Sequence, residues 1–497
     1  MSAPGVRIHA DAPGVRTGPG SPGHPLRVAV VGSGPAGFYA AEALLESGIA
    51  VEVDILERLP VPYGLVRHGV APDHARLKAV TAVFEGIARD PRCRFLGNVE
   101  LGREVSVARL SALHHAVIVA TGARDSRPLG IPGESLRGVH AASDFVGWYN
   151  GLPGCADLRV DLSREVAVVV GHGNVAIDVC RILARPVDEL RRTDIARHAL
   201  EALAASRVRE IHLVGRRGPV QARFTPKELR ELGALPGWRV AVHPASLRPD
   251  DASLAELHRP EAVHAARNLE ILRDFAGRMT DAPRTLHIHF LRAPVSLHGD
   301  GRLEAVELER MALRGHPGAQ VAVPTGRRER LAAGLLFASV GHAGRPLPGL
   351  PFDARRGTLA NREGRIVDGD RPLRGWYAAG WIRRGASGVI GTNRADAVDT
   401  VARLLEDLPW LEAPRPGGAA LLDTLRASGH PVTTFDDALA IEAAERERGR
   451  ALGKAAEKFV RVPEMLAVAA ARRATPSRLH TESVFPVPPP MKESSWP

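Results

Sequence analysis

The residues with the clearest chemical meaning are three glycines in one short turn, Gly32, Gly34 and Gly37. An apolar run over residues 27–31 precedes the turn and a helix-like stretch follows it, which predicts a buried strand, a turn and a helix. In this arrangement the first glycine permits a tight turn and the second lets the backbone approach a pyrophosphate. The third glycine, next to Ala36, lets helix and strand pack closely. The spacing therefore predicts a dinucleotide-binding turn, with helix N–H groups facing the phosphates.

A carboxylate stands where such a site needs one. A second apolar strand is predicted over residues 51–56, and Glu57 follows it directly. A carboxylate in this place can accept hydrogen bonds from the two hydroxyls of a ribose. The glycine spacing alone would also fit an ordinary tight turn, but strand, turn, helix, strand and acid in this order favour a dinucleotide.

The same spacing returns later in the chain, at Gly171 and Gly173, with Ala176 in the third place. The apolar residues 165–170 precede it and an amphipathic helix is predicted after it. This is the variant of the motif in which alanine replaces the third glycine. One chain therefore has two predicted dinucleotide sites.

The second site differs from the first in the residues that follow its next strand. That strand is predicted over residues 210–214, and Arg216 and Arg217 come after it instead of an acid. Two guanidinium groups can bind a 2′-phosphate that a carboxylate would repel, so the pattern favours NADPH over NADH. The alternative is that both arginines are ordinary solvated surface residues.

Composition places the chain among globular proteins. Its 497 residues predict two to four domains, 44% of them are hydrophobic and 25% are charged. No apolar run approaches the roughly 20 residues of a membrane span, so no stable membrane insertion is expected. The formal net charge is 66 − 56 = +10, but only five basic residues are lysine and the arginines are spread along the chain. We interpret this as an arginine-favouring coding bias, with a basic docking face for an acidic partner as the alternative, and predict no nucleic-acid partner.

The three cysteines, Cys93, Cys155 and Cys180, lie far apart without a CxxC motif. Their spacing predicts no disulfide framework, no metal site and no iron–sulfur cluster, and it disfavours a disulfide reductase of the thioredoxin type. Residues 1–25 lack the apolar stretch of a secretion signal and contain Asp11, unlike an acid-free mitochondrial presequence. These observations favour a cytoplasmic location.

Seven segments together resemble one known family. Residues 115–123, HAVIVATGA, are similar to the link between the FAD and pyridine-nucleotide domains of two-dinucleotide flavoproteins. Over residues 27–402 the chain resembles the adrenodoxin-reductase-like branch of ferredoxin:NADP reductases, which includes mycobacterial flavoproteins. The segments that carry the resemblance are VAVVGSGPAGFYAAEALL, LERLPVPYGLVRHGVAPDH, FLGNVELG, AASDFVGWYNG, VVGHGNVAIDVCRIL, VGRRGPVQARFTPKELREL and GWIRRGASGVIGTNRADAVDT.

The resemblance implies that the first site binds FAD. Beyond the first glycine turn and Glu57, the residues it assigns to FAD are Leu65, Val99, Trp381, Gly388, Val389 and Ile390. Physical chemistry supports the last group, because residues 388–393 precede a predicted helix. Its dipole and N–H groups can face the flavin edge that becomes anionic on reduction.

For NADPH the resemblance implies Asn174 and Val175 at the pyrophosphate, Arg216 and Arg217 at the 2′-phosphate, and Glu228 near the nucleotide. It also implies that a histidine and a glutamate flank the two rings.

That pair maps onto His74 and Glu231, which could orient the nicotinamide or relay a proton. The chain departs from the family pattern at Tyr63, His68 and His172, and we expect the two histidines to be surface residues without effect.

The predicted fold class is α/β, with two three-layer Rossmann-like domains and the NADP domain inserted in a discontinuous FAD domain. Within the insert, residues 286–297 and 302–311 predict a meander, and 416–471 predict a peripheral helical appendage. In the proline-rich tail, Phe485 and Trp496 leave a docking role open. The predicted units are a disordered arm (1–25), FAD domain (26–124 and 341–415), NADP domain (125–340), appendage (416–471) and tail (472–497).

The predicted function is FAD-dependent NADPH:ferredoxin oxidoreduction, with hydride passing from NADPH to flavin N5 and single electrons to an iron–sulfur ferredoxin. Ferredoxins are typically acidic, and residues 191–209 and 380–385 are arginine-rich enough to form a docking face. One alternative is an NADPH-dependent flavoprotein with a quinone or another small acceptor. A second is a flavin-binding redox sensor that turns over negligibly.

Overall fold

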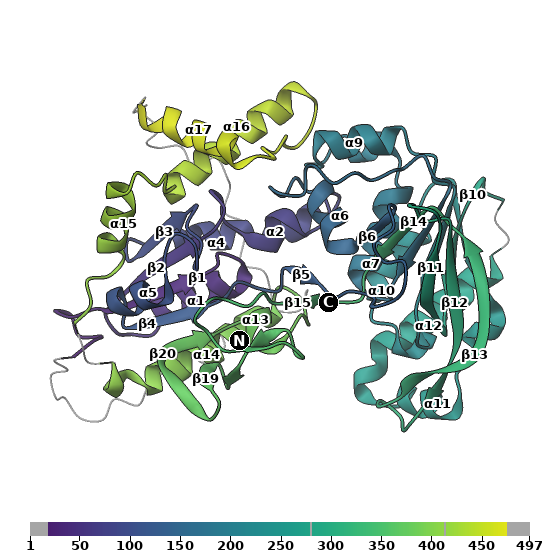
Figure 1. Ribbon diagram of the computed structural model, residues 1–497, viewed down its shortest axis with the longest axis horizontal. Helices are drawn as coiled ribbons and strands as arrows, with labels where there is room; N and C mark the ends of the chain where they lie inside the picture. The colour runs from purple at the N-terminus through teal and green to yellow at the C-terminus, as the bar shows by residue number, and fades with distance from the viewer. Residues whose placement is uncertain (1–17, 279–280, 412–413, 475–497) are drawn as a thin grey trace.

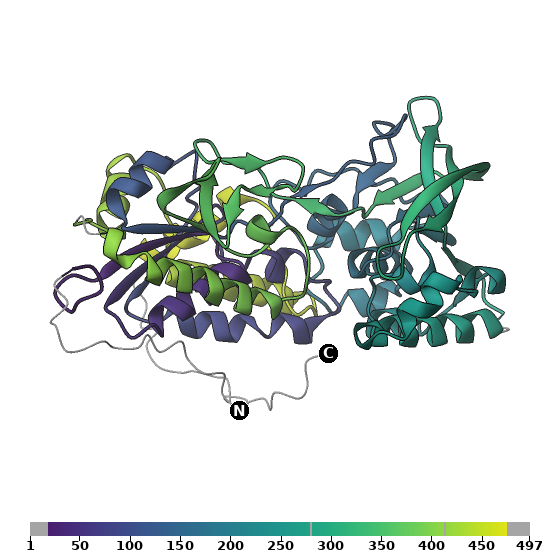
Figure 2. The same cartoon turned by 90° about the horizontal axis from the view of Figure 1, so that it is seen from below.

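The computed structural model describes residues 18–278, 281–411 and 414–474. Two α/β lobes lie side by side, each built on its own sheet (Figure 1). Strands and helices alternate along the chain around each of the two glycine turns, so each turn belongs to its own α/β lobe. Figure 2 shows the long helices of both lobes on one side of the two sheets.

The first lobe contains a seven-stranded sheet in the order β18-β19-β20-β4-β1-β2-β3. The strands from β20 to β3 are mutually parallel, and β18 and β19 add an antiparallel edge. The strands are β1 (Leu26–Val31), β2 (Val51–Glu57), β3 (Cys93–Gly97), β4 (Ala116–Val119), β18 (Asn361–Arg362), β19 (Arg365–Asp368) and β20 (Arg371–Ala378).

Helices cover both faces of this sheet because its central strands are apolar on both sides. Val28 and Val30 of β1 face a cluster shared with α1, α4 and α14, whereas Ala29 and Val31 face a cluster with α5 and α15. Parallel strands buried on both faces have this near-continuous apolar pattern. The helices are α1 (Pro35–Leu45), α4 (Thr81–Ala88), α5 (Val107–Leu113), α14 (Thr392–Glu406) and α15 (Gly418–Ala427).

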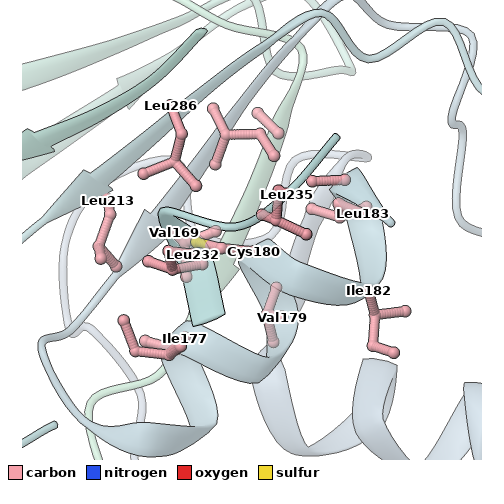
Figure 3. Packing of buried hydrophobic residues seen from close by; sticks show 14 of the residues in the cluster. Val169, Ile177, Val179, Cys180, Ile182, Leu183, Leu213, Leu232, Leu235 and Leu286 are labelled. Atoms are coloured by element: carbon pink, nitrogen blue, oxygen red, sulfur yellow. The ribbon is translucent and has the colours of Figure 1, made fainter. Parts of the chain in front are cut away.

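The second lobe contains a six-stranded parallel sheet in the order β6-β14-β7-β8-β10-β9. On one face, Ile177 and Val179 of α7 lie close to Leu213 and Leu232 (Figure 3). The strands and the covering helices are β6 (Val139–Ala141), β7 (Val166–Val170), β8 (Glu210–Val214), β9 (Trp238–Val242), β10 (Arg284–His289), β14 (Leu335–Ala338), α7 (Asn174–Ala184), α10 (Pro226–Leu232) and α12 (Val263–Gly277).

The opposite face of the second sheet packs against an antiparallel sheet of β11 (Arg292–His298), β12 (Ala305–Arg314) and β13 (Val321–Ala332). The meander predicted from residue 286 is therefore wrong in its first part. Residues 286–289 belong to β10, which pairs in parallel with β8. Leu286 and Ile288 are buried against the helices, and Leu291, with a φ of 54°, turns the chain into the meander.

Two extended segments join the lobes. On the way out the chain forms β5 (Asp125–Ser126), on the way back it forms β15 (His342–Ala343), and the two pair antiparallel. The second lobe is thus an insertion between two parts of the first, which confirms the predicted fold class. The residue limits given above for the units stay predictions.

The C-terminal segment contains α16 (Phe435–Ala451) and α17 (Val462–Ala474), and it is less peripheral than predicted. Between these helices, Lys458 is buried, and its Nζ donates to the carbonyl oxygens of Arg67 in the first lobe and Asn150 in the second, both at 3.2 Å. It also lies 2.8 Å from Asp194 Oδ2. The segment therefore connects both lobes through buried charges. The sequence alone does not show which of its charged residues are buried.

The two predicted loose ends are partly ordered. Residues 18–25 pack against the first lobe, where the N–H of Ala50 donates to the carbonyl oxygen of Gly20 at 3.0 Å. At the other end, α17 continues to Ala474. Residues 1–17 and 475–497, with most of the predicted arm and tail and with Phe485 and Trp496, lie outside the described residues. Within the described ranges, no helix combines the length and apolarity that a membrane crossing needs.

Candidate active site

The first glycine turn lies between β1 and α1, at the carboxyl end of the sheet. Gly32 has a φ of +111°, and a Cβ there would lie 2.5 Å from the carbonyl oxygen of Ala120. A Cβ on Gly37 would lie 1.9 Å from the carbonyl oxygen of Gly32, so helix and turn touch through the missing side chain. A Cβ on Gly34, in contrast, would meet no atom within 4 Å. The middle glycine thus faces open space, as a site for a pyrophosphate requires.

Three other segments converge on this turn. The N–H of Tyr63 donates to the carbonyl oxygen of Ser33 at 3.0 Å, and a Cβ on Gly64 would lie 3.1 Å from the Cα of Gly34. The N–H of Val99 donates to the carbonyl oxygen of Glu57 at 2.8 Å. The structure therefore brings together the predicted FAD residues of the first 100 positions.

Glu57 is buried at the end of β2, and its carboxylate is oriented by the turn itself. Oε2 accepts from the Ser33 hydroxyl at 2.7 Å and from the Ser33 N–H at 3.2 Å, and Oε1 accepts from the N–H of Leu59 at 3.1 Å. A carboxylate oxygen has two lone-pair directions, so Oε1 keeps acceptor capacity for a ribose hydroxyl. The geometry fits the predicted role.

The predicted apolar contacts differ in what they can offer a ligand. Leu65, on α2 (Gly64–His68), is 43% exposed and Val389 is 56% exposed, which is unusual for large apolar side chains. The side chain of Val99 is fully buried in the core, so only its main chain can contact a ligand. Ala36 is buried too, where a Cβ on Gly380 would approach its methyl group to 2.5 Å.

The fourth segment of the site is the loop between α13 (Trp381–Arg384) and α14. Trp381 Nε1 donates to the carbonyl oxygen of Ser387 at 2.9 Å and holds the exposed Gly388 and Val389 beside the helix start. The first N–H groups of α14 already donate to the carbonyl oxygens of residues 389–391. The N–H groups of Ile390 and Gly391 have no acceptor in the described part of the chain, so they are the main-chain donors available to an anionic edge.

Two arginines of α13 precede this loop and pair with an acid inside the lobe. Arg383 and Arg384 are mostly buried and pair with Asp396, each at 3.3 Å. Asp396 also accepts a hydrogen bond from the N–H of Gly380. Residues 380–385 were expected to add to a docking face. Arg383 and Arg384 share the single carboxylate of Asp396, so the two guanidiniums keep a net positive charge, and this expectation stays a prediction.

The second glycine turn repeats the geometry of the first. Gly171 has a φ of +128°, and a Cβ there would lie 2.2 Å from the carbonyl oxygen of Ser339 on the neighbouring strand's end. A Cβ on Gly173 would meet no atom within 4 Å. Asn174 and Val175 begin α7 beside this open space, and Asn174 Oδ1 accepts from the N–H of Thr225 at 2.9 Å. Ala176 is fully buried where the first turn has Gly37.

Arg216 and Arg217 lie directly after β8, as the sequence predicts. Arg216 is exposed and Arg217 half-buried, and neither has an ion pair with a carboxylate among the described residues. Burial lowers the pKa of Arg217, and the positive charges of Arg223 and Arg216 lower it further. Arg216, Arg217 and Arg223 form no ion pair with a carboxylate of the described residues. Three such guanidiniums beside a glycine turn make a site for a multiply charged anion such as a 2′-phosphate.

The predicted ring-flanking pair spans the two lobes. His74 precedes α3 (Ala75–Lys78) in the first lobe, and its Nε2 lies 3.0 Å from Oε2 of Glu231 on α10 in the second. Burial, the largest single influence, lowers the pKa of His74, but the hydrogen bond to Glu231 and the negative charges of Glu228 and Asp178 together raise it above its ordinary value. The two residues that the sequence pairs only by resemblance are thus in direct contact.

Arg181 connects this pair to its surroundings and was missed in the sequence. Its side chain is fully buried on α7. It donates to both oxygens of Asp73 at 2.8 and 3.1 Å. It also donates to Glu228 and Glu231 at 2.9 Å and to Asp178 at 2.7 Å. The available signal was an arginine inside the apolar stretch VCRIL, where an unpaired charge would be very costly.

Glu228 is buried and faces Arg181, so its predicted contact with the nucleotide would compete with this ion pair. Asp178 has a pKa that burial raises to about 7, although the charge of Arg181 opposes the shift. The cluster thus contains more carboxylates than cations, which is consistent with a proton held at His74.

His68 and His172 are not surface residues, contrary to expectation. His68 is 3% exposed, and neither ring nitrogen has a hydrogen-bond partner among the described residues. The ring of His172 packs edge-on against Phe290 with centroids 4.8 Å apart, and burial lowers its pKa to about 4. His68 fills core space at the end of α2, and His172 fills core space in the second glycine turn. The sequence alone does not show whether such a histidine is buried or exposed.

Two dinucleotide turns, one with an acid and one with arginines at the following strand end, define a two-dinucleotide oxidoreductase fold. The family described as pyridine nucleotide-disulphide oxidoreductase matches residues 26–232. The chain is 44% identical over 452 residues to human NADPH:adrenodoxin oxidoreductase, covering 88% of this chain and 91% of that protein.

Mycobacterial proteins match equally well. NADPH-ferredoxin reductase FprA of Mycobacterium tuberculosis is 43% identical over 461 residues, which cover 89% of this chain and 99% of FprA. The solved structure of FprA in complex with NADPH superposes with a TM-score of 0.85 at 42% identity, covering 90% of this chain and all of that one. The chain therefore belongs to the family of NADPH-dependent adrenodoxin and ferredoxin reductases, which confirms the resemblance seen in the sequence.

Proposed function

We propose that this protein is an FAD-dependent NADPH:ferredoxin oxidoreductase. The observation that carries the proposal is the pair of open glycine turns whose strand ends differ, Glu57 in one lobe and Arg216 with Arg217 in the other. Bound FAD would accept a hydride from NADPH and pass the electrons on singly to an iron–sulfur protein. Residues of the chain select the nucleotides, orient them and hold charge.

In the first lobe, Glu57 Oε1 binds the ribose of FAD while Ser33 keeps the carboxylate in place. Leu65 and Val389 cover apolar surface of the cofactor, and Trp381 holds the loop that presents the N–H groups of Ile390 and Gly391. These donors stabilise negative charge that develops on the flavin. Glycines 32, 34 and 37 bring the pyrophosphate against the start of α1.

In the second lobe, Asn174 and Val175 place the pyrophosphate of NADPH at the start of α7. Arg216 and Arg217 bind its 2′-phosphate, so the site prefers NADPH over NADH. His74 and Glu231 share a proton between Nε2 and Oε2. Arg181 donates a hydrogen bond to Glu231 and so keeps its carboxylate within hydrogen-bond distance of the histidine. The pair thus positions the nicotinamide between the lobes. It supplies or removes a proton while the contact between His74 and Glu231 is kept.

We further propose that residues 191–209 form part of the face that receives an acidic ferredoxin. Arg192 and Arg209 are exposed, and no carboxylate of the described residues pairs with them. Free positive charges attract an acidic partner over a distance that salt shortens, so association is expected to be fast at low ionic strength.

The decisive experiment is anaerobic reduction of a small acidic ferredoxin by NADPH, followed through bleaching of the ferredoxin. Fast, salt-sensitive reduction with NADPH, and little with NADH, is the expected result. Reversing charge in R192E/R209E should slow reduction at low salt more than R314E/R327E, which reverses the same number of charges at exposed arginines of β12 and β13. Equal slowing by both variants would remove residues 191–209 from the docking face.

Two other outcomes would change the proposal. A flavin that bleaches with NADPH but reduces no ferredoxin in a panel would indicate an enzyme with a quinone or another small acceptor. A flavin that stays oxidised would indicate a redox sensor. No direct observation favours either alternative over the ferredoxin reductase.

We also propose a cytoplasmic location. All three cysteines lie in described ranges and none is in a disulfide, which suits a reducing compartment. Fractionation of cells followed by immunodetection tests this, and recovery of the protein in an organelle or membrane fraction would contradict it.

A further inference from the structure

Three histidines and a glutamate gather on two neighbouring strands of the second sheet. β8 and β10 run parallel in a register that places His212 beside His287. Glu210 lies two residues before His212, and His289 two residues after His287, so all four side chains project from the same face of the sheet. The predicted NADPH residues follow the other end of β8, and none of them belongs to this cluster.

Three of these side chains, those of Glu210, His212 and His287, each place one ligand atom within 4.8 Å of the other two. Glu210 Oε1 lies 3.0 Å from His212 Nε2 and 3.1 Å from His287 Nε2. The two imidazole rings are stacked, with centroids 4.8 Å apart and planes at 9°, so their nitrogens face the carboxylate from the same side. Ligand atoms around a tetrahedral zinc ion with bonds of about 2.0–2.1 Å lie roughly 3.3 Å from one another. The observed separations of Glu210 from the two histidines are close to this value.

The buried nitrogen of His212 has no hydrogen bond that explains its position. His212 is only 5% exposed, and its Nε2 makes no hydrogen bond with acceptable geometry although Glu210 Oε1 is 3.0 Å away. Leaving a buried polar atom without a hydrogen-bond partner is unfavourable. A cation bound by both atoms would satisfy the nitrogen and the carboxylate together.

The second nitrogen of the same ring has the support that metal-binding histidines usually have. His212 Nδ1 lies 2.9 Å from His289 Nε2, within hydrogen-bond distance. A proton on Nδ1 leaves Nε2 as a lone-pair acceptor 3.0 Å from the carboxylate oxygen of Glu210, and two acceptors so close together repel each other unless a cation binds both.

The cluster is accessible from one side. The side chains of Glu210 and His287 are 41% and 30% exposed, which leaves room for an ion to enter and for water to complete the coordination. The charged groups that act on these rings include Arg239 of β9 at His287, and Arg292 and Glu329 at His289. One carboxylate and two neutral imidazoles are a ligand set that zinc takes in proteins.

We propose that Glu210 Oε1, His212 Nε2 and His287 Nε2 form a site for a divalent transition metal of the zinc type. Water is the fourth ligand, and His289 orients His212. The sequence interpretation predicted no metal site because it considered cysteine spacing, whereas these ligands come from strands about 75 residues apart that meet only in the sheet. A metal here links β8 to β10 and stabilises the NADP lobe.

The test is zinc binding to the FAD-loaded full-length protein after removal of metals with a chelator. Isothermal titration with Zn²⁺ is expected to show one site per chain, and X-ray absorption at the zinc edge is expected to show two imidazole ligands. The variants E210Q and H287Q change partly exposed side chains, so both should fold. Each should weaken the affinity for Zn²⁺ at least about 10-fold, because even the loss of a group that only hydrogen-bonds to a metal ligand has an effect of this size. H289N should weaken it less than either.

The matched control is H264Q, which changes an exposed histidine on α12 outside the cluster and should bind Zn²⁺ like the wild type. Circular dichroism and flavin content establish that each variant is folded. No stoichiometric binding by the wild type, or equal affinity in E210Q, H287Q and H264Q, would overturn the proposal. Ferredoxin reduction is not the readout, so the result is independent of the proposed activity.

Discussion

The two glycine turns use the same backbone geometry but opposite charges around it. In both turns the first glycine has a positive φ and packs against a neighbouring carbonyl oxygen, and the second faces open space. The first lobe has Glu57 at the end of β2 and Glu42 inside α1, where the second has Arg216 after β8 and Arg181 inside α7. The backbone therefore recognises what two dinucleotides share, the pyrophosphate. The side chains recognise what differs between them.

The two helix interiors also differ in how deeply the charge is buried. Glu42 pairs at 3.2 Å with Arg394, whose side chain is 58% exposed, whereas Arg181 is fully buried among four carboxylates. An arginine in that position joins the lobes, because Asp73 belongs to the first and Glu228 and Glu231 to the second. A surface ion pair in the equivalent position only fastens α1 to α14.

The largest expected effect comes from removing this buried cation. R181M should destabilise the protein by about 3–5 kcal/mol, because it leaves several carboxylates without their common partner. E42Q should cost at most about 1 kcal/mol, since its partner is well solvated. Urea unfolding followed by circular dichroism measures both, and equal losses would show that the lobes are not held together through Arg181.

The third position of each turn offers a sharper comparison. G37A should cost about 3 kcal/mol and lower the FAD content, because the added methyl group would lie 1.9 Å from the carbonyl oxygen of Gly32. The reverse change, A176G, should cost only about 1 kcal/mol through helix propensity. Flavin absorbance per chain and urea unfolding test the pair. Full FAD content in G37A would mean that α1 can move away from the turn without loss of the site.

Nucleotide choice should depend on the strand end and not on the turn. R216A/R217A should lower kcat/KM for NADPH at least about 100-fold and leave kcat/KM for NADH nearly unchanged, since each charged hydrogen bond contributes about 1.5–3 kcal/mol. Steady-state kinetics with a ferricyanide acceptor measures this, with R209A as the control for loss of an exposed arginine. A parallel loss with both nucleotides would place the arginines at a phosphate that both share.

The smallest effect concerns pH. The pKa of His74 is raised in the folded protein and that of Glu231 is lowered, so the folded state favours the ionised pair. The contribution of His74 is complete below its unfolded pKa of about 6.5 and is lost as pH rises through the higher folded value. The Tm difference between wild type and H74Q should correspond to about 1 kcal/mol near pH 6 and shrink toward pH 9. A difference that grows with pH would contradict the raised pKa.

Local sequence was sufficient to predict a binding site where one short segment contains all of its residues. Both glycine turns, the strands before them, Glu57 and the two arginines could be predicted because each turn and its strand ends are defined within about 50 residues. The contact of His74 with Glu231 was predicted only through resemblance, since 157 residues separate them. Arg181, the buried histidines and the charged contacts of Lys458 could not be assigned, because burial of a polar side chain depends on partners from distant segments.

The sequence by itself determined the number of dinucleotide sites, their order and their charge preference. Glycine spacing and strand-end residues act through local backbone geometry and local charge, which need no knowledge of the rest of the chain. Only the tertiary structure decided which groups meet across the lobes, at Arg181, and across the second sheet, at Glu210, His212 and His287. Such contacts arise from strand order and lobe packing, and the free energy that selects them is spread over the whole core.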